Sequence, residues 1–309
     1  MINSDRNAVK LGKDLASYCT GLIETGFSRL PKQETTDHKI LPHQGSIQEH
    51  IRLLKINQEV MQKLIEDKKI QNAAMPALFH PDFHKRNVYV SAEEPTTITG
   101  LIDWQSASIE PAFIYTNDIP DFAALPEETE DVLGTEEQKK ASDPKKYERE
   151  QRDLLICYQT YDVIMTGLIP KMRPAKLLDP TLFRLFHYCH TSWRDSAAAV
   201  RQELVDLAAQ WTELGLQGQC PFSMTEEELE KHAKEYEDFE SIQNLKSFLK
   251  NTLHTSSDGW VPIDAWDSTR DAHRAIYDQW METAKQSESS GEEDMSIEKA
   301  DKMWPFDAR

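Results

Sequence analysis

The sequence predicts an α+β fold that is mostly helical and carries one small β-hairpin near its first third. Three observations support this prediction. Apolar residues recur at helical spacing over residues 47–68, the segment 88–102 is instead rich in β-forming residues, and helical patterns return over 151–169 and 180–214. Because 39% of the 309 residues are hydrophobic, the chain contains enough apolar side chains for a packed core.

The first well-defined helix is expected over residues 47–68. An amphipathic helix places an apolar residue at every third or fourth position of its buried face. The residues in this pattern are Ile51, Leu54, Val60, Met61, Leu64 and Ile65. Residues 1–46 show mixed helical tendencies with a polar stretch at 32–39, and we interpret them as a helical segment that leads into the main domain.

A β-hairpin is expected after this helix. The short apolar run 75–79 is followed by a polar loop from His80 to Asn87. Residues 88–90 and 97–102 are both β-rich, and the turn-like sequence SAEEPT separates them. Two β-rich runs joined by a short turn pair as antiparallel strands, so we expect the chain to reverse direction within this segment.

The rest of the chain is predicted to be helical with charged connections. Residues 126–150 are charged and poor in large apolar residues, which indicates a solvated loop followed by a helix start. Thr225 and Glu228 have the spacing of a capping box, a typical helix start. The C-terminal segment is rich in Ser and Glu. The sequence therefore divides into the leading segment at 1–46, the main domain at 47–281 and an acidic mobile tail at 282–309.

The charge balance disfavours nucleic-acid binding, because the formal net charge is -18 and such proteins need a basic surface. No apolar run reaches the roughly 18 residues of a membrane span. The N-terminus shows no signal or transit pattern. We therefore expect an intracellular protein with no membrane span and no targeting segment in this chain. The four cysteines are far apart and form no C-x-x-C pair, which predicts free thiols: Cys19, Cys157, Cys189 and Cys220.

The loop and the hairpin contain the residue types that phosphoryl transfer requires. Asp82 is followed five residues later by Asn87, and the second strand ends just before Asp103. A carboxylate can orient and deprotonate an attacking hydroxyl, while Mg²⁺ prefers carboxylate and amide oxygens. Because the hairpin returns the chain, we expect Asp103 to lie beside Asn87. The sequence therefore predicts Asp82 at the substrate and a magnesium site at Asn87 and Asp103.

In these two segments the sequence resembles the aminoglycoside phosphotransferase and choline-kinase-like family. The family pattern is H-x-D-x-x-x-x-N, followed by a hydrophobic strand and I-D-W or I-D-F, and it stands here as HPDFHKRN and GLIDWQ. The segments IEPAF, PDFAALPEE and DGWVP are similar to the fungal phosphotransferases of the "altered inheritance of mitochondria" group. The resemblance covers roughly residues 45–270, and its specific part is 78–104.

The resemblance implies a fold, a reaction and a role for each residue of the motif. The fold is the helical C-terminal lobe of the protein-kinase-like fold, and the reaction uses ATP and Mg²⁺ to phosphorylate a small-molecule hydroxyl. Asp82 is implied to be the catalytic base, with Asn87 and Asp103 as the Mg²⁺ ligands. His80 is implied to orient the loop, and His84 to support it. The fungal relatives also imply a mitochondrial location.

Several positions depart from the family pattern. Pro81 stands where many relatives have glycine. Lys85 and Arg86 stand where many have Pro-Gly, and Gln105 stands where glutamate is frequent. None of these differences removes the base or a metal ligand, so they concern the substrate and the rate rather than the class of reaction.

The nucleotide-binding N-terminal lobe of the kinase-like fold is not evident in the sequence. That lobe supplies a phosphate-covering loop and a lysine that pairs with the phosphates. Upstream of Asp82 there is no G-x-G-x-x-G and no β-run of the V-A-x-K type. We therefore expect a truncated chain with at most trace activity on its own and an exposed lobe face that favours self-association. The alternative is a non-catalytic binding or scaffolding protein derived from the same fold.

Two other patterns allow a different interpretation. The tripeptide HPD also occurs in the J-domain, where a basic helix precedes the tripeptide and another helix follows it. Residues 72–79 contain no Lys or Arg and the segment after Asn87 is β-rich, so the J-domain is disfavoured. Three residues suggest a metal cluster, but their apolar helical context is more typical of core or surface positions: His187, Cys189 and His190.

Overall fold

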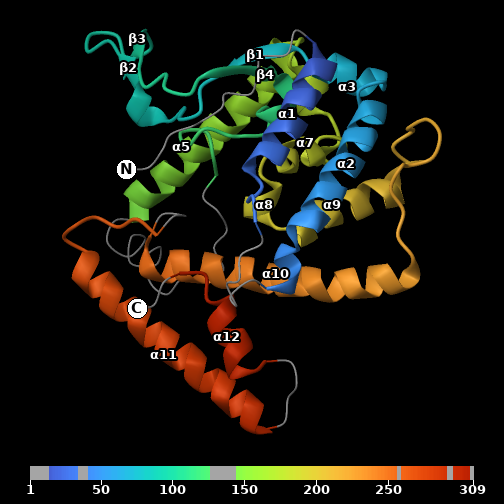
Figure 1. Ribbon diagram of the computed structural model, residues 1–309. Coiled ribbons are helices and arrows are strands. Elements are labelled where there is room, and N and C mark those ends of the chain that lie inside the picture. The colour runs from blue at the N-terminus through green and yellow to red at the C-terminus, as the bar shows by residue number, and fades with distance from the viewer. Residues whose placement is uncertain (1–13, 34–40, 126–143, 256–258, 291–294, 307–309) are drawn as a thin grey trace. The chain divides into compact units, whose positions relative to one another are not determined.

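The computed structural model describes residues 14–33, 41–125, 144–255, 259–290 and 295–306 (Figure 1). Most of these residues are helical, and the strands form two small antiparallel sheets. The predicted α+β class is therefore confirmed. The chain divides into two compact units. Unit 1 comprises Met1–Arg29, Leu54–Thr191 and Glu203–Ser223, and unit 2 comprises Leu30–Leu53, Ser192–Gln202 and Met224–Arg309.

Unit 1 contains most of the described helices. They are α1 (Leu15–Arg29), the larger part of α2 (Ile47–Leu64), α3 (Lys68–Ala73), α5 (Pro144–Val163), α6 (Arg173–Lys176), α7 (Arg184–Cys189) and the second half of α9 (Ala197–Gln210). Short 3-10 turns lie at Lys85–Asn87, Ala112–Ile114 and Pro180–Leu182, and a π-helical turn at Ile164–Leu168 extends α5.

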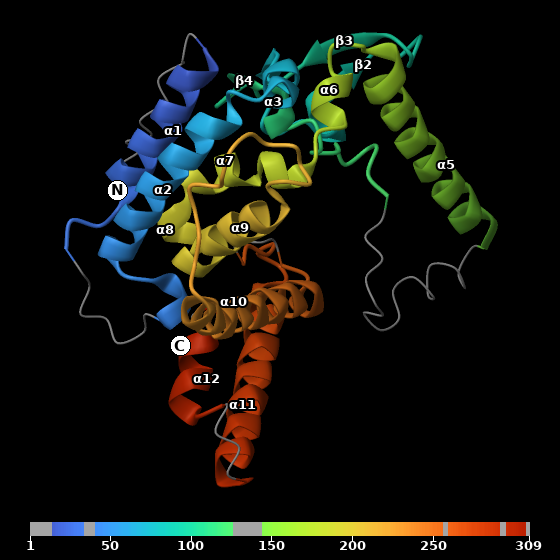
Figure 2. The same cartoon turned by 90° about the vertical axis from the view of Figure 1, so that its right-hand side faces the viewer.

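Helices α1 and α2 lie side by side in unit 1 (Figures 1 and 2). Gly26 of α1 allows this close packing, because a Cβ at that position would collide with the carbonyl oxygen of Cys189 and the side chain of Leu54. Cys19, at the same face of α1, is buried. Gly26 therefore allows α1 to come into contact with α7.

The predicted helix at 47–68 is confirmed over the range of α2, Ile47–Leu64. Four of its six apolar positions are buried: Leu54, Val60, Met61 and Leu64. A second helix, α3, begins near the end of the apolar pattern. Asp67 accepts a hydrogen bond from the Lys69 amide at 2.7 Å and caps α3. A side chain that satisfies the first amides of a helix fixes where that helix begins.

The predicted hairpin is also confirmed. Strand β2 (Val88–Val90) pairs antiparallel with β3 (Ile98–Leu101), with Val88 opposite Leu101 and an irregularity at Tyr89/Val90. A second pairing was not predicted: β1 (Pro76–Phe79) pairs with β4 (Ser108–Pro111). The two strands of this pair flank the hairpin in sequence, so β1 and β4 hold the base from which the hairpin extends.

The segment 180–214 is largely helical, as its pattern predicted, but it is divided into several elements. It contains a 3-10 turn, α7, α8 (Ser192–Asp195) and α9. Ser196, between α8 and α9, has a left-handed φ of 93°, which a continuous helix cannot contain. The predicted helix at 151–169 corresponds to α5 and its π-helical turn. Of the predicted charged loop, residues 126–143 lie outside the described part of the chain.

Unit 2 contains the long helices α10 (Glu226–Leu253) and α11 (Trp266–Ser290) and the short helix α12 (Ile297–Met303). The predicted capping box is confirmed at the start of α10, where Thr225 and Glu228 each bind the other's backbone amide. Helices α11 and α12 lie side by side in both views (Figures 1 and 2).

The predicted tail at 282–309 contains helical segments among its described residues. Helix α11 continues through residue 282 to Ser290, and α12 follows. Trp304 lies in a buried cluster with Leu249 and Leu253, and the Trp280 indole donates to the carbonyl oxygen of Ala300 at 3.0 Å. Aromatic side chains pack against α12 and stabilise this segment, although its polar composition suggested a tail. The division of the chain at 46 and 281 remains a prediction.

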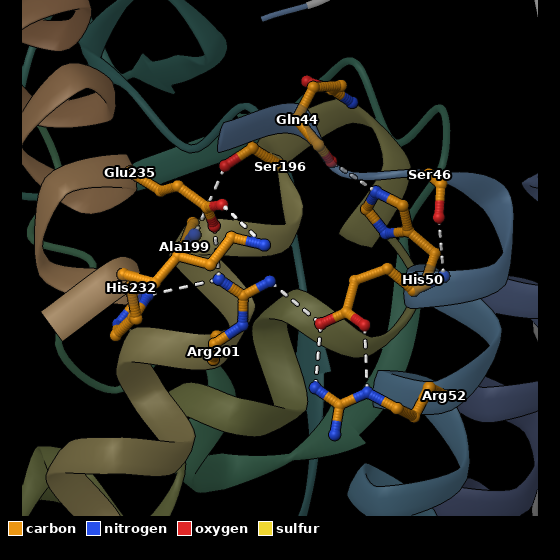
Figure 3. Close-up of polar contacts among 11 residues, drawn as sticks. Gln44, Ser46, His50, Arg52, Ser196, Ala199, Arg201, His232 and Glu235 are labelled. Atoms are coloured by element: carbon orange, nitrogen blue, oxygen red, sulfur yellow. Dashed lines mark hydrogen bonds and ion pairs between the residues drawn. The ribbon is translucent and has the colours of Figure 1, made fainter. Parts of the chain in front are cut away.

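An ion network around the buried Arg201 lies within unit 2 (Figure 3). The guanidinium of Arg201 is 2.9 Å from Glu49 Oε1 and 2.8 Å from Glu235 Oε2. Arg52 forms two further hydrogen bonds with the Glu49 carboxylate, each 2.9 Å long. This network joins the first turns of α2 to α9 and α10 by charged groups whose partners are far apart in sequence.

No helix among the described residues is both long and apolar enough to cross a membrane. The four cysteines are free thiols, as the sequence predicted. Cys189 is fully buried against Met61, and burial raises the pKa of the Cys19 thiol to about 12. These two thiols are therefore core side chains.

Candidate functional site

The candidate site lies in unit 1, on the loop between β1 and β2 and at the end of β3. β1 ends at Phe79, and the 3-10 turn Lys85–Asn87 leads directly into β2. The pairing of β2 with β3 then brings the chain back toward the loop. The local sequence pattern thus places both halves of the predicted motif at one end of the hairpin.

His80 connects the two halves of the motif through its ring nitrogens. The ring is buried, its Nε2 lies 2.8 Å from the carbonyl oxygen of Ile102, and its Nδ1 lies 3.3 Å from the Asp82 amide. Because Nδ1 accepts from an amide, the hydrogen must be on Nε2. His80 therefore ties the backbone just before Asp103 to the backbone of Asp82. The ring of Trp104 packs edge-on against it at 4.7 Å.

The carboxylate of Asp82 is held on both oxygens. His84 Nε2 lies 2.6 Å from Oδ1, and Asn87 Nδ2 donates to Oδ2 at 3.0 Å. The Asp82 side chain nevertheless remains 50% exposed. Two partners fix the orientation of the carboxylate, while its exposure leaves it accessible.

Asn87 is a buried side chain that directs its amide nitrogen toward Asp82. Nδ2 donates to the Asp82 carbonyl oxygen at 2.8 Å as well as to its carboxylate. Oδ1 has no hydrogen-bond partner within the described ranges. In addition, the Asn87 carbonyl oxygen accepts a hydrogen bond from the Ile102 amide at 3.1 Å. Asp103 is therefore the next residue after the backbone partner of Asn87.

Asp103 has an unusual backbone conformation. Its φ is 67°, in the left-handed region that Asp tolerates better than most residues but that still costs free energy. Its side chain is exposed and forms no ion pair within the residues that the structure covers. A strained and unpaired carboxylate at the end of a strand is consistent with a ligand role. The convergence of this carboxylate on Asn87 remains a prediction.

The donor atoms at this site fit a hard cation. The described residues contain no group of three or more His, Cys, Asp or Glu side chains that could hold a metal. The predicted ligand set is different, since it consists of an amide oxygen and a carboxylate: Asn87 and Asp103. Carboxylate and amide oxygens are the ligands that Mg²⁺ prefers. Cys189, one member of the alternative cluster, instead donates to the Leu185 carbonyl oxygen in the core at 3.0 Å.

Two neighbouring residues contact the loop and were not singled out by sequence reasoning. Asp121 Oδ1 accepts a hydrogen bond from the Lys85 amide at 2.9 Å, and the Phe122 ring packs against the Phe83 ring. These contacts join residues nearly forty positions apart, and no local spacing rule connects them. Both residues lie in the segment PDFAALPEE, whose similarity to the fungal subgroup does not indicate these contacts.

A second set of titratable side chains lies elsewhere in unit 1. Burial raises the pKa of Asp118, and the nearby His187 opposes that shift. Burial lowers the pKa of His187, and Asp118 opposes that shift in turn. Burial also raises the pKa of Tyr161, and the charge of Asp118 raises it further. His187 therefore has a carboxylate neighbour that the sequence pattern did not indicate.

Comparison with known proteins supports the resemblance. Residues 10–114 match the phosphotransferase enzyme family. The chain is 25% identical over 268 residues to "Altered inheritance of mitochondria protein 9, mitochondrial" of Saccharomyces cerevisiae (strain YJM789), covering 80% of this chain and 41% of that protein. The protein of the same name from Kluyveromyces lactis is 23% identical over 269 residues, covering 81% and 42%.

These comparisons confirm the predicted family resemblance. The match at 10–114 contains every residue of the predicted motif. The chain spans about two fifths of the length of the curated relatives it matches. No solved structure matches the chain.

Proposed function

Because residues 10–114 match a phosphotransferase enzyme family, we propose that the chain contains the catalytic loop and metal-binding strand end of an ATP-dependent phosphotransferase. The region 47–281 would be the helical C-terminal lobe of a kinase-like enzyme, and the phosphate acceptor a small-molecule hydroxyl. The observation that carries the proposal is the half-exposed Asp82 carboxylate, held by His84 and Asn87.

In this proposal Asp82 is the catalytic base. The proton of the acceptor hydroxyl passes to an Asp82 oxygen, and the hydroxyl oxygen forms a bond to the γ-phosphorus of ATP. The bond from that phosphorus to the bridging oxygen breaks, and ADP leaves. Each carboxylate oxygen of Asp82 has one protein partner, from His84 or Asn87, and a further lone pair for the substrate.

Asn87 and Asp103 are the proposed Mg²⁺ ligands. Asn87 directs Nδ2 to Asp82, so its Oδ1 is available to bind the cation. Asp103 adds an exposed carboxylate just after the backbone pair between Ile102 and Asn87. Bound Mg²⁺ would neutralise phosphate charge and orient the phosphates for in-line attack.

The two histidines are proposed to act through other residues. His80 keeps the backbone of Asp82 at a fixed place relative to Ile102, and so to the strand end that carries Asp103. His84 fixes one oxygen of the Asp82 carboxylate. Neither histidine needs to touch the substrate for these roles.

The metal site can be tested on the purified chain. Titration with Mn²⁺, followed by its paramagnetic signal and by competition with Mg²⁺, should reveal one site that Asn87→Ala and Asp103→Asn weaken. Asp179→Asn, which changes a carboxylate elsewhere in unit 1, is the control. Calorimetry with Mg·ATP and a γ-phosphate transfer assay over small hydroxyl compounds then examine the reaction. Failure of the wild-type chain to bind Mn²⁺ would refute the metal site.

A second candidate function is a non-catalytic binding or scaffolding role. The observation that favours it is a set of large apolar side chains exposed around the loop and sheets, including Leu78, Tyr89, Ile98 and Trp104. Such a surface is typical of contact with another protein or domain, and self-association is expected there as well. If Mn²⁺ and Mg·ATP leave the chain unaffected while it forms dimers, this second function is favoured.

We also propose a mitochondrial location for the natural product. The relatives from two yeasts are named as mitochondrial proteins. Fractionation of the source organism with an antibody against this chain tests the location. Exclusive recovery in the cytosolic fraction would contradict it.

A further inference from the structure

The loop that carries Asp82 is held from outside by Asp121 and Phe122, which follow each other in the chain. Asp121 Oδ1 accepts a hydrogen bond from the Lys85 amide at 2.9 Å. The Phe122 and Phe83 rings meet edge to face, with centroids 5.5 Å apart and planes at 84°. Both contacts lie within unit 1. They form a two-point clamp on the segment Phe83–Lys85.

The contact from Asp121 satisfies a donor that the loop cannot satisfy itself. Lys85 is the first residue of the 3-10 turn that ends at Asn87, and His84 before it provides no side-chain cap. The first amides of a helical turn lack partners within the turn. A carboxylate there satisfies such an amide and also places negative charge at the positive end of the turn. Asp121 is therefore the cap of the turn that carries Asn87.

The two contacts of the clamp flank His84. Phe83 precedes it and packs its ring on Phe122, and Lys85 follows it with its amide bound to Asp121. Both neighbours of the residue whose Nε2 lies 2.6 Å from Asp82 Oδ1 are therefore in contact with the clamp. The turn also sets the place of Asn87, which holds the other carboxylate oxygen. Both partners of the Asp82 carboxylate therefore lie in the segment that the clamp contacts or in the turn that Asp121 caps.

We infer that Asp121 is a positioning residue of the candidate site, which with Phe122 keeps His84 and Asn87 in place on either side of the Asp82 carboxylate. The inference rests on the proposed function in one respect: Asp82 and Asn87 are the residues whose placement matters for chemistry. Asp121 acts through the backbone of Lys85 and is not assigned a contact with the substrate.

The test compares matched variants of the 309-residue chain. Asp121→Ala removes the cap, whereas Asp121→Asn keeps a carbonyl oxygen as acceptor. Asp179→Ala is the control, because Asp179 Oδ1 accepts from the Thr181 amide at 2.9 Å and caps another 3-10 turn in unit 1. Phe122→Leu removes the ring contact with Phe83 while it keeps apolar bulk.

Three measurements separate positioning from general stability. Amide hydrogen exchange at Lys85 reports the cap, NMR signals of the His84 ring report its bond with Asp82, and Mn²⁺ titration reports the site. Asp121→Ala should speed exchange at Lys85 about tenfold, as expected for a lost cap. It should also shift the His84 signals and weaken Mn²⁺ binding about tenfold, the lower end of the effect of supporting residues.

The matched variants complete the expected pattern. Asp121→Asn should restore most of each readout, Asp179→Ala should change none of them, and Phe122→Leu should shift the His84 signals in the same direction as Asp121→Ala. This last variant decides the question if Asp121→Ala does not fold.

Several results would overturn the inference. One is an unchanged Lys85 exchange rate in Asp121→Ala, and another is an equal response in Asp179→Ala. Faster exchange with unchanged His84 signals and Mn²⁺ affinity would mean that Asp121 is a structural cap and nothing more. A wild-type chain that binds no Mn²⁺ refutes the proposed metal site, and the exchange and His84 readouts then decide on Asp121 by themselves.

Discussion

The carboxylate of Asp82 in unit 1 and that of Glu49 in unit 2 are held by different kinds of partner. Asp82 is bound by an imidazole and a carboxamide, and its side chain is 50% exposed. Glu49 is bound by two guanidinium groups, from Arg52 and from the buried Arg201 (Figure 3). The first carboxylate is fixed but remains accessible, whereas the second is matched by charge and packed between helices.

The partners of each carboxylate indicate its role. Burial by itself would raise the pKa of Glu49, but hydrogen bonds from Arg52 and Arg201 outweigh that effect and lower it to about 2. Such a group stays ionised to a lower pH than an ordinary glutamate side chain does. A structural role fits Glu49, while the partners of Asp82 allow a substrate to approach.

The largest effect is expected from Asp82→Ala in a form of the protein that also carries an N-terminal lobe. If Asp82 is the base, kcat should fall about 10²–10⁴-fold with little change in KM. The free energy of unfolding should change little because the side chain is half exposed. Steady-state kinetics and urea unfolding check both expectations, with Glu93→Ala on the hairpin turn as control. An undiminished kcat would show that Asp82 is not the base.

The next largest effect is expected from Arg201→Ala in unit 2. The substitution leaves Glu49 and Glu235 without their buried cation, and breaking such a pair costs about 3 kcal/mol. Urea unfolding measures this loss. The control is Arg194→Ala, since Arg194 is 76% exposed in its pair with Asp195 and should contribute less than about 1 kcal/mol. Equal losses for the two variants would show that burial does not distinguish the Arg201 network.

A smaller effect is expected from pH through Glu49. Its pKa in the folded state, about 2, lies below the ordinary value of 4.5. The stabilisation is therefore fully present above about pH 4.5 and is lost as the pH falls toward 2, with about 2 kcal/mol lost by pH 3. The stability difference between wild type and Glu49→Gln should shrink over that window. A difference that stays constant from pH 6 to pH 3 would contradict the assigned pKa.

The smallest effect on stability is expected from Asp103→Gly, which also tests the assignment of the site. Removal of a ligand should weaken Mn²⁺ binding, while glycine relieves the left-handed backbone and raises stability by up to about 1 kcal/mol. His254→Gly is the matched control, because His254 has a φ of 51° at the end of α10. It should raise stability without a change in Mn²⁺ affinity. A variant of Asp103 that loses stability and keeps its Mn²⁺ affinity would make this residue structural.

Local patterns in the sequence predicted several elements correctly. The helix at 47–68, the hairpin and the capping box at Thr225 each depend on residues within a few positions of one another. Hydrophobic periodicity and turn chemistry report on such short-range structure directly. The motif from His80 to Asn87 was found in the same way, as a fixed spacing of polar residues beside two β-rich runs.

Other features follow from contacts between distant segments. The pairing of β1 with β4, the cap from Asp121 to Lys85 and the ion network of Arg201 all join residues that no spacing rule relates. The C-terminal residues read as a polar tail in sequence, yet α12 brings Trp304 into a buried cluster. Composition describes a segment by itself and contains no information on which surface will bury it.

The identity and order of the polar groups at the candidate site could be predicted from the sequence alone, because Asp82, Asn87 and Asp103 follow from a short motif and a hairpin. The way in which the Asp82 carboxylate is held, with one oxygen on His84 and the other on Asn87, follows from the folded chain, as do the residues that clamp the loop. The physical reason is that hydrogen-bond geometry depends on distances of a few ångströms between folded segments, and a linear pattern does not contain those distances.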